Sequence, residues 1–272
     1  MFLVAFALFY REFSMSKIAK KANTKFLRTH EIDEAENVSF IRKQKRKPTT
    51  GISNLQLKEI HPLTDTQGKV FDLYNNTDQQ LVLSGYPGSG KSFMALYLAL
   101  NDVLYGENGY ERIIVLKSLV SSRGIGFLPG SVEEKQDPYF SAYHDICNEL
   151  FGRGDAAEIL LKKDVIQFEN TSFLRGVTFN NCVVVVDEFQ NANFQELDTV
   201  AGRKGKNCRM IFCGDKYQTD LLYSKNDVSG YDNFFKILNN MDEVNIVGFG
   251  IDDIVRSGFV KNYIIQKIKL GL

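Results

Sequence analysis

An eight-residue stretch at positions 85–92 combines the residue types that hold a phosphate chain. It reads Gly-Tyr-Pro-Gly-Ser-Gly-Lys-Ser and matches the pattern G-x-x-x-x-G-K-[ST]. Its glycines let the backbone wrap a phosphate without Cβ clashes, Lys91 can reach the β- and γ-phosphates, and the Ser92 hydroxyl can bind Mg²⁺. An apolar run precedes the stretch and a helical pattern begins at Phe93, which is the strand-loop-helix setting that phosphate binding needs. The predicted nucleotide-binding residues are Gly85, Tyr86, Pro87, Gly88, Ser89, Gly90, Lys91, Ser92 and Phe93.

Two adjacent acids, Asp187 and Glu188, follow a second apolar run at residues 182–186. The end of such a strand would bring Asp187 to the Mg²⁺ beside Ser92, and Glu188 would stand where it can polarise the attacking water. The alternative is a pair of acids that cap the next helix. Together with the phosphate-loop residues, the pair is typical of Walker B chemistry. It predicts a nucleotide hydrolase with Ser92 and Asp187 as metal ligands.

A third motif, residues 214–218, reads Gly-Asp-Lys-Tyr-Gln and also follows an apolar run, which places it at the same edge of a parallel sheet. Such a sequence can mark nothing but a turn. Taken in order, residues 187–190 (Asp-Glu-Phe-Gln) and residues 214–218 resemble the ATPase domain of superfamily 1 helicases. In those proteins the glutamine that matches Gln218 senses the γ-phosphate and couples it to movement, so the resemblance implies a catalytic role for Gln218.

Further motifs make the chain resemble the PhoH family over residues 62–265. They are residues 126–130 (Gly-Phe-Leu-Pro-Gly), 134–135 (Glu-Lys), 137–139 (Asp-Pro-Tyr) and 175–176 (Arg-Gly). The resemblance implies a RecA-like ATPase core that uses ATP and Mg²⁺ and is commonly oligomeric. Some members carry an N-terminal PIN nuclease domain linked to RNA unwinding and cutting, and the roughly 60 residues before this core are too few for one. The short, core-only form resembles those found widely in tailed phages.

Two residues have roles that the residue types alone leave open. Gln67 stands where helicase relatives place a glutamine that reads the adenine edge, but with Thr64 it also forms a capping box that needs no ligand. ATP is therefore favoured over GTP mainly by the resemblance. Lys117 stands where the PhoH family usually has arginine, and because lysine cannot form a bidentate phosphate contact, the polynucleotide contact implied at this position does not transfer directly.

Arg256 lies after the last predicted strand, in a segment that resembles the terminal arginine motif of the PhoH family. One interpretation is a local ion pair with Asp252 or Asp253. The other is a finger arginine that stabilises the charge on the γ-phosphate during transfer. A chain with a single lobe has no second lobe to supply such a residue, so we expect Arg256 to complete the site of a neighbouring subunit in a ring, with action on its own nucleotide as the alternative.

Six short apolar runs predict the strands that position these motifs. Because they are apolar throughout, they indicate a parallel sheet that helices cover on both faces. No linker divides residues 62–272, which predicts one catalytic domain. The runs are residues 80–83, 112–116, 165–168, 182–186, 209–213 and 244–249.

The composition is that of an ordinary soluble protein, with 33 basic and 33 acidic side chains among 272 residues. This balance gives no support to a partner bound by net charge, so a nucleic-acid contact needs a local patch. The candidates are the loop at residues 121–124, which includes Arg123, and the basic run at residues 42–47, which can equally be a solvated tail. The four cysteines form no CxxC pair, so we expect no zinc site and predict reduced thiols in the cytoplasm, with Cys182 at the edge of the core.

Residues 1–55 form a predicted polar and basic extension ahead of an ATPase domain at residues 56–272. The first ten residues are nearly all apolar, but a membrane-spanning helix needs roughly 20. Met15 begins a more ordinary polar start, so residues 1–14 are interpreted as the product of an upstream start codon, or else as a weak membrane- or partner-binding tail.

The sequence therefore predicts an α/β protein with the three-layer, RecA-like P-loop NTPase fold and a mostly parallel central sheet. Its predicted activity is hydrolysis of ATP with Mg²⁺, coupled to remodelling of single-stranded nucleic acid, with RNA preferred over DNA. The alternative is an ATP-driven protein-interaction switch. We expect a homo-oligomeric ring without membrane attachment in the cytoplasm, or in the host cytoplasm if a phage encodes the chain.

Overall fold

The computed structural model describes residues 55–118, 132–171, 174, 176–215 and 228–271, with the backbone alone for residues 132–139. The chain separates into two compact units, Met1–Arg46 and Lys47–Leu272, and every described residue belongs to the second. Of the predicted N-terminal extension only Leu55 is described. Its side chain is 2% exposed and joins the hydrophobic core, so the packed domain includes Leu55.

Six strands form one parallel sheet in the order β3-β2-β4-β5-β1-β6. All six predicted strands are present, which confirms the α/β fold class. Five of them extend one or two residues beyond the predicted carboxyl end, because the polar and glycine residues there still pair in the parallel ladder. The strands are β1 (Gln80–Gly85), β2 (Arg112–Lys117), β3 (Ile166–Asn170), β4 (Cys182–Asp187), β5 (Cys208–Gly214) and β6 (Val244–Phe249).

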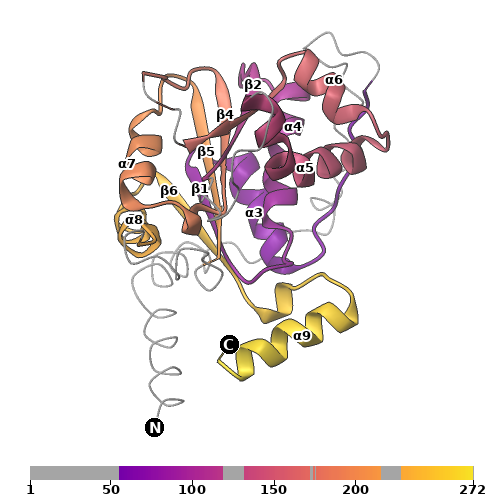
Figure 1. The fold of residues 1–272 in the computed structure, drawn as a ribbon, viewed down its shortest axis with the longest axis vertical. Helices are drawn as coiled ribbons and strands as arrows, with labels where there is room; N and C mark the ends of the chain where they lie inside the picture. Colours follow the sequence, from indigo (N-terminus) through magenta and orange to yellow (C-terminus); the bar gives the residue numbers. More distant parts are fainter. Residues whose placement is uncertain (1–54, 119–131, 172–173, 175, 216–227, 272) are drawn as a thin grey trace, which may run out of the picture. The chain divides into compact units, whose positions relative to one another are not determined.

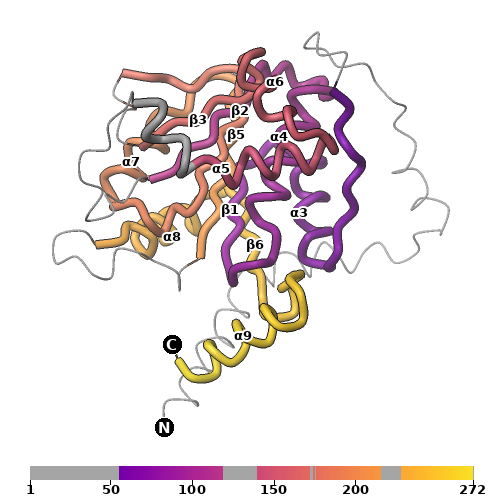
Figure 2. The backbone as a smooth tube through the Cα atoms, turned by 45° about the vertical axis from the view of Figure 1, so that its right-hand side comes forward, coloured from indigo at the N-terminus to yellow at the C-terminus, as the bar shows by residue number. Residues whose placement is uncertain are grey.

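Helices cover both faces of this sheet, as Figures 1 and 2 show. One face carries α3 (Asp65–Asn76), α4 (Lys91–Tyr105), α5 (Val132–Phe151) and α6 (Ala156–Lys162). The other carries α7 (Phe194–Gly202) and α8 (Tyr231–Leu238), and α9 (Gly258–Lys269) lies apart from both layers. Two short 3-10 helices, η3 (Phe189–Asn191) and η5 (Ile251–Asp253), follow β4 and β6. Among the described helices none is both long and apolar enough to cross a membrane.

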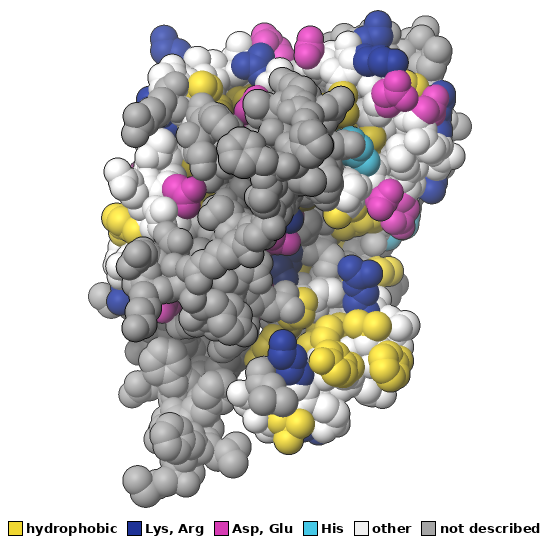
Figure 3. Space-filling view, viewed as in Figure 1, with side chains coloured by type: hydrophobic (Ala, Val, Ile, Leu, Met, Phe, Trp, Pro, Cys, Tyr) yellow, Lys and Arg dark blue, Asp and Glu magenta, His cyan; other side chains and the backbone are white. Residues whose placement is uncertain are grey.

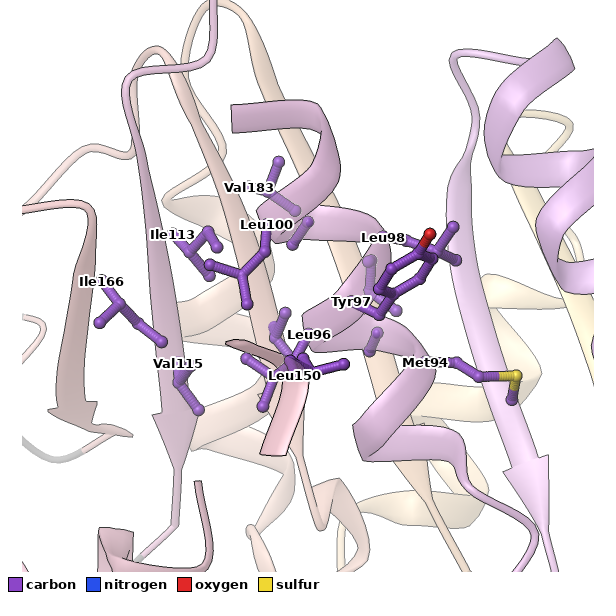
Figure 4. Close-up of a cluster of buried hydrophobic side chains, with 14 of the residues drawn as sticks. Met94, Leu96, Tyr97, Leu98, Leu100, Ile113, Val115, Leu150, Ile166 and Val183 are labelled. Carbon is purple, nitrogen blue, oxygen red and sulfur yellow. The ribbon is translucent and has the colours of Figure 1, made fainter. Parts of the chain in front are cut away.

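Alternate residues of the strands fill two separate cores. In β4, Val183 and Val185 pack toward α4 and α5, while Val184 and Val186 face the α7 and α8 side. Figure 4 shows the first core, where Leu96 and Leu100 of α4 lie against the sheet. This two-sided burial explains why the strand sequences are apolar without alternation.

The four cysteines are buried free thiols. Cys213 belongs to the core on the α4 face and Cys208 to the core on the α7 face, as their odd spacing in one strand predicts. The position expected for Cys182 is wrong. It is fully buried instead of lying at the core's edge, because β4 is a central strand and Cys182 pairs in register with Cys208 of β5.

The carboxyl ends of β1, β5 and β4 lie level with one another. Cys213 of β5 is the register partner of both Leu83 in β1 and Asp187 in β4. Neighbouring strands stand about 4.8 Å apart, so one intervening strand separates the β1 and β4 ends by roughly 10 Å. The fold therefore places the phosphate-loop sequence and the acidic pair at one edge of the sheet.

Candidate nucleotide-binding and hydrolysis site

The phosphate loop connects the end of β1 to the first residue of α4, Lys91. Gly88 and Gly90 adopt left-handed φ angles of 76° and 81°, which glycine accepts without strain. At Gly85, a Cβ would lie 2.2 Å from the Phe249 carbonyl oxygen, so the loop can leave β1 closely against β6 only because this side chain is absent. The first N–H groups of α4 face the loop and have no partners within the helix, which suits an anion.

Lys91 is folded back over the loop and only 9% exposed. Its Nζ donates to the carbonyl oxygens of Gly85 and Tyr86 at 2.8 and 2.7 Å and to Ser89 Oγ at 3.2 Å. Burial lowers the pKa of Lys91, and the negative charge of Asp215 opposes that shift. The ammonium group thus stands inside the loop, where phosphate oxygens can replace the carbonyl groups that now bind it.

Asp187 is joined directly to the phosphate loop. Ser92 Oγ donates to Asp187 Oδ1 at 2.9 Å, so the two predicted metal ligands lie together. The backbone N–H of Glu188 donates to the same oxygen at 2.9 Å. Oxygen donors of this kind suit a hard cation such as Mg²⁺. The helix-capping alternative is wrong, because Glu188 makes no side-chain cap at η3 and α7 is capped by Asn193.

Tyr143 of α5 completes the surroundings of Asp187, and no motif predicted it. Its hydroxyl donates to Asp187 Oδ2 at 2.8 Å, and its side chain is 3% exposed. Burial raises the pKa of Tyr143 well above its usual value, and the charge of Asp187 raises it further, so the phenol stays protonated and keeps donating. A tyrosine on an amphipathic helix is usually a core residue, which is why sequence reasoning passed over it.

Gln67 lies beneath the phosphate loop with its side chain 4% exposed. Its Nε2 donates to the Ser89 carbonyl oxygen at 3.0 Å, and its Oε1 accepts from the Leu63 N–H at 2.7 Å. Thr64 Oγ1 accepts from the Gln67 N–H at 3.2 Å, so one half of the capping box forms and the reciprocal bond goes to Leu63. Gln67 therefore ties the start of α3 to the phosphate loop.

Arg256 follows η5 and lies over the phosphate loop of its own chain. The Val255 N–H donates to the Gly88 carbonyl oxygen at 3.0 Å, and a Cβ built on Gly88 would come within 2.7 Å of Arg256 Cγ. No ion pair joins Arg256 to Asp252 or Asp253, all three of which the structure describes. The Asp253 carboxylate accepts from the Gly250 N–H instead.

The two helicase-like motifs contact each other between β4 and β5. The Asp215 N–H donates to Gln190 Oε1 at 3.0 Å. A Cβ on Gly214 would lie 2.5 Å from the Phe189 ring, so the glycine allows this close packing. Gln218, Arg123 and the basic run at residues 42–47 lie outside the described residues, as does Arg175.

Comparison with known proteins identifies relatives over most of the chain. A family model described as PhoH-like protein matches residues 59–268. Protein PhoH of Escherichia coli (strain K12) is 27% identical over 243 residues, which cover 88% of this chain and 67% of the relative. PhoH-like proteins of Bacillus subtilis (strain 168) and Synechocystis sp. are 29% and 32% identical over 182 residues. Each match covers 66% of this chain, and it spans only 55% and 54% of those two relatives.

Solved structures give more distant similarities. The Sulfolobus solfataricus SWI2/SNF2 ATPase core in complex with dsDNA has a TM-score of 0.39 and 18% identity, over 66% of this chain and 37% of that chain. The Pif1 helicase from Candida albicans has a TM-score of 0.35 and 15% identity, over 70% and 40%. The fold assignment rests on the strand order and the phosphate loop, since these scores are low.

Proposed function

The chain belongs to the PhoH-like protein family of P-loop NTPases, and we propose that it binds ATP with Mg²⁺ and hydrolyses the nucleotide through Asp187 and Glu188. The observation that carries this proposal is the hydrogen bond from Ser92 Oγ to Asp187 Oδ1, at 2.9 Å. It joins the second residue of α4, directly after the phosphate loop, to the last residue of β4. A glycine-rich turn without a nucleotide role gives no reason for this contact.

The residues present fit a nucleotide and a magnesium ion. Gly88 and Gly90 turn the loop through left-handed φ angles, and Lys91 supplies a positive charge inside it. Ser92 and Asp187 would hold Mg²⁺, which supplies neutralisation of the charge on the β- and γ-phosphates. In this scheme Glu188 accepts the proton of the attacking water.

We assign base recognition to Gln67, which makes ATP the preferred nucleotide. An amide can bond both N6 and N7 of adenine. Both amide atoms of Gln67 are engaged in the structure, by the Ser89 carbonyl oxygen and the Leu63 N–H, so adenine would replace those two bonds. An open hollow of about 400 Å³ adjoins this point on α3, lined by residues 62–65, 68, 69 and 72. The support for this role is the position of Gln67 beside the phosphate loop. The same amide also stabilises the loop through its bond to Ser89.

We further propose that hydrolysis is coupled to single-stranded nucleic acid, with RNA preferred. The support is the direct contact between the two motifs that resemble superfamily 1 helicases, through Gln190 and the Asp215 N–H. The predicted contact segments, residues 121–124 and 42–47, carry the cationic side chains for phosphate binding.

The second candidate function is an ATP-driven protein-interaction switch, which the exposed apolar side chains of α9 favour. ATPase rates measured with and without single-stranded RNA, single-stranded DNA and duplex separate the two. Several-fold stimulation by a single strand supports nucleic-acid coupling. The contrary result is an ATPase rate that is clearly higher than that of Lys91→Ala but does not change with any polynucleotide. That result contradicts the coupling and supports the switch.

We also propose a homo-oligomer in which α9 contacts a second copy. None of its residues is buried, and Phe259, Tyr263 and Leu270 are 82%, 62% and 71% exposed. Figure 3 shows hydrophobic side chains gathered with basic ones over the part of the molecule that α9 forms. The α8 region across the sheet offers exposed Ile237 and Met241 near the acids Asp232, Asp242 and Glu243.

Complementary charge therefore supports a head-to-tail contact in which basic α9 docks on the acidic α8 region of the next copy. Contacts of this kind close into rings when the rotation between copies permits. The ATP requirement and the four free thiols support a cytoplasmic location.

A further inference from the structure

Lys117 and Glu188 form an ion pair at the carboxyl edge of the sheet. Lys117 Nζ lies 3.1 Å from Glu188 Oε2, with the two side chains 19% and 43% exposed. Lys117 ends β2 and is the register partner of Asp187 in β4. In the sheet order, β2 neighbours β4 on the side opposite β5 and β1. The pair therefore draws the Glu188 carboxylate away from the strand that carries the phosphate loop.

The backbone of Glu188 is consistent with this displaced position. Its φ and ψ are 50° and 41°, in the left-handed region that residues other than glycine, asparagine and aspartate seldom adopt. The other non-glycine residues with positive φ in the described part of the chain are Asp164, Asn181 and Asn207. Backbone conformations of this kind persist where neighbouring contacts hold them, and they gather at functional sites. Here the carbonyl oxygen of Glu188 accepts from the Asn191 N–H at 2.8 Å.

Lys117 is itself held in place at the site. Its Nζ lies 5.8 Å from the ring centroid of Tyr143, the residue that donates to Asp187. An ammonium group in direct contact with a carboxylate oxygen occupies one of its lone pairs and restrains the direction in which the carboxylate points. The contact therefore directs the Glu188 carboxylate toward the end of β2.

We propose that Lys117 is a positioning residue that restrains ATP hydrolysis by holding Glu188 off the attacking water. The inference rests on the proposed function, because it assigns Glu188 the role of proton acceptor. Release requires another anion to take Lys117, and a phosphodiester group of a single-stranded nucleic acid carries the charge that the Lys117 ammonium group can bind. Exchange of Lys117 from Glu188 to that phosphate would raise the hydrolysis rate when a strand is bound.

The test is the ATPase rate of Lys117→Met without polynucleotide. We expect kcat to rise several-fold while KM for ATP stays unchanged, because the restraint acts on the proton acceptor and leaves the phosphate loop intact. Lys117→Arg keeps the positive charge and should return kcat to the low wild-type value. Lys162→Met is the matched control, since Lys162 forms an exposed ion pair with Glu158 on α6, and it should leave the rate unchanged.

A single-stranded RNA oligonucleotide is then added to each protein. Stimulation should be marked in the wild type and small in Lys117→Met, which is already released. A kcat for Lys117→Met equal to or below that of the wild type overturns the restraint, and full stimulation of the variant overturns the exchange. A wild-type rate no higher than that of Lys91→Ala would instead remove the proposed function, and the restraint with it. Lys117→Gln serves as the second variant if Lys117→Met does not give a folded protein by thermal melting.

Discussion

At the scale of single residues, Arg256 decides whether the site is complete within one chain. Its stem lies against Gly88, and the neighbouring Val255 N–H is bonded to the Gly88 carbonyl oxygen. This places the stem of Arg256 beside the phosphate loop of its own chain. We therefore propose that Arg256 acts on the nucleotide of its own chain, which is the alternative to the neighbouring-subunit role expected from the sequence.

Arg256→Ala should lower kcat strongly, since a finger arginine is worth about 10³ to 10⁵ in rate. If Arg256 acts on its own nucleotide, mixing Arg256→Ala subunits with Lys91→Ala subunits restores no activity, because every subunit carries one defect. Native mass spectrometry of the mixture checks that subunits have exchanged. Recovery of activity in mixed assemblies would show action between subunits, and full activity of Arg256→Ala alone would remove the catalytic role.

The motif residues were predictable because their function fixes their type and spacing. Ser92 and Asp187 are far apart in sequence, yet each belongs to a short motif whose residue types indicate a metal ligand. Tyr143 and the partner of Lys117 were not predictable, because they depend on how α5 and the end of β2 pack around β4. No local spacing in the sequence records such a contact between distant segments.

At the scale of elements, Arg209 of β5 holds the carboxyl end of α3. Arg209 is 2% exposed. Its Nη1 and Nη2 donate to the carbonyl oxygens of Tyr74 and Thr77, at 2.7 Å each. Its guanidinium carbon Cζ lies 3.9 Å from the centroid of the Tyr74 ring. The last carbonyl groups of a helix lack partners within it, so a buried arginine both satisfies them and complements the helix dipole.

Arg209→Met should lower the free energy of unfolding by about 2 kcal/mol or more, because buried carbonyl groups lose charged donors. Urea denaturation measures the change. Arg153→Met is the matched control, since Arg153 pairs with Asp155 at the surface, and it should leave the free energy of unfolding nearly unchanged. Equal stability of the Arg209 variant and the wild type would contradict the role in anchoring α3.

The strands were predictable because a strand that is buried on both faces appears in the sequence as a short run of consecutive apolar residues. The bond between Arg209 and α3 was not, since an arginine at the start of an apolar run is normally expected at the surface. The contact of Gly85 with β6 was likewise not predictable from the local pattern. The pattern requires a glycine there for the phosphate, whereas the structure shows that β6 leaves no room for a Cβ.

At the scale of the whole molecule, α9 stands out among the described helices because none of its residues is buried. Replacing Phe259 and Tyr263 together by serine should lower the mass of the native assembly, because the proposed contact with a second copy loses its largest apolar side chains. Light scattering after size-exclusion chromatography measures that mass. Val177→Ser, at an exposed valine remote from α9, is the control. An unchanged mass in the double variant would contradict the contact.

The central claim is that residues 85–92 bind ATP and that Glu188 drives its hydrolysis. The most direct measurement combines ATP binding and single-turnover hydrolysis for Glu188→Gln beside Lys91→Ala. Glu188→Gln should bind ATP nearly as the wild type does and hydrolyse it about 10² to 10⁴ times more slowly, because a general base typically supplies that factor. Lys91→Ala should lose binding or turnover. Hydrolysis by Glu188→Gln at a rate close to that of the wild type would contradict the account.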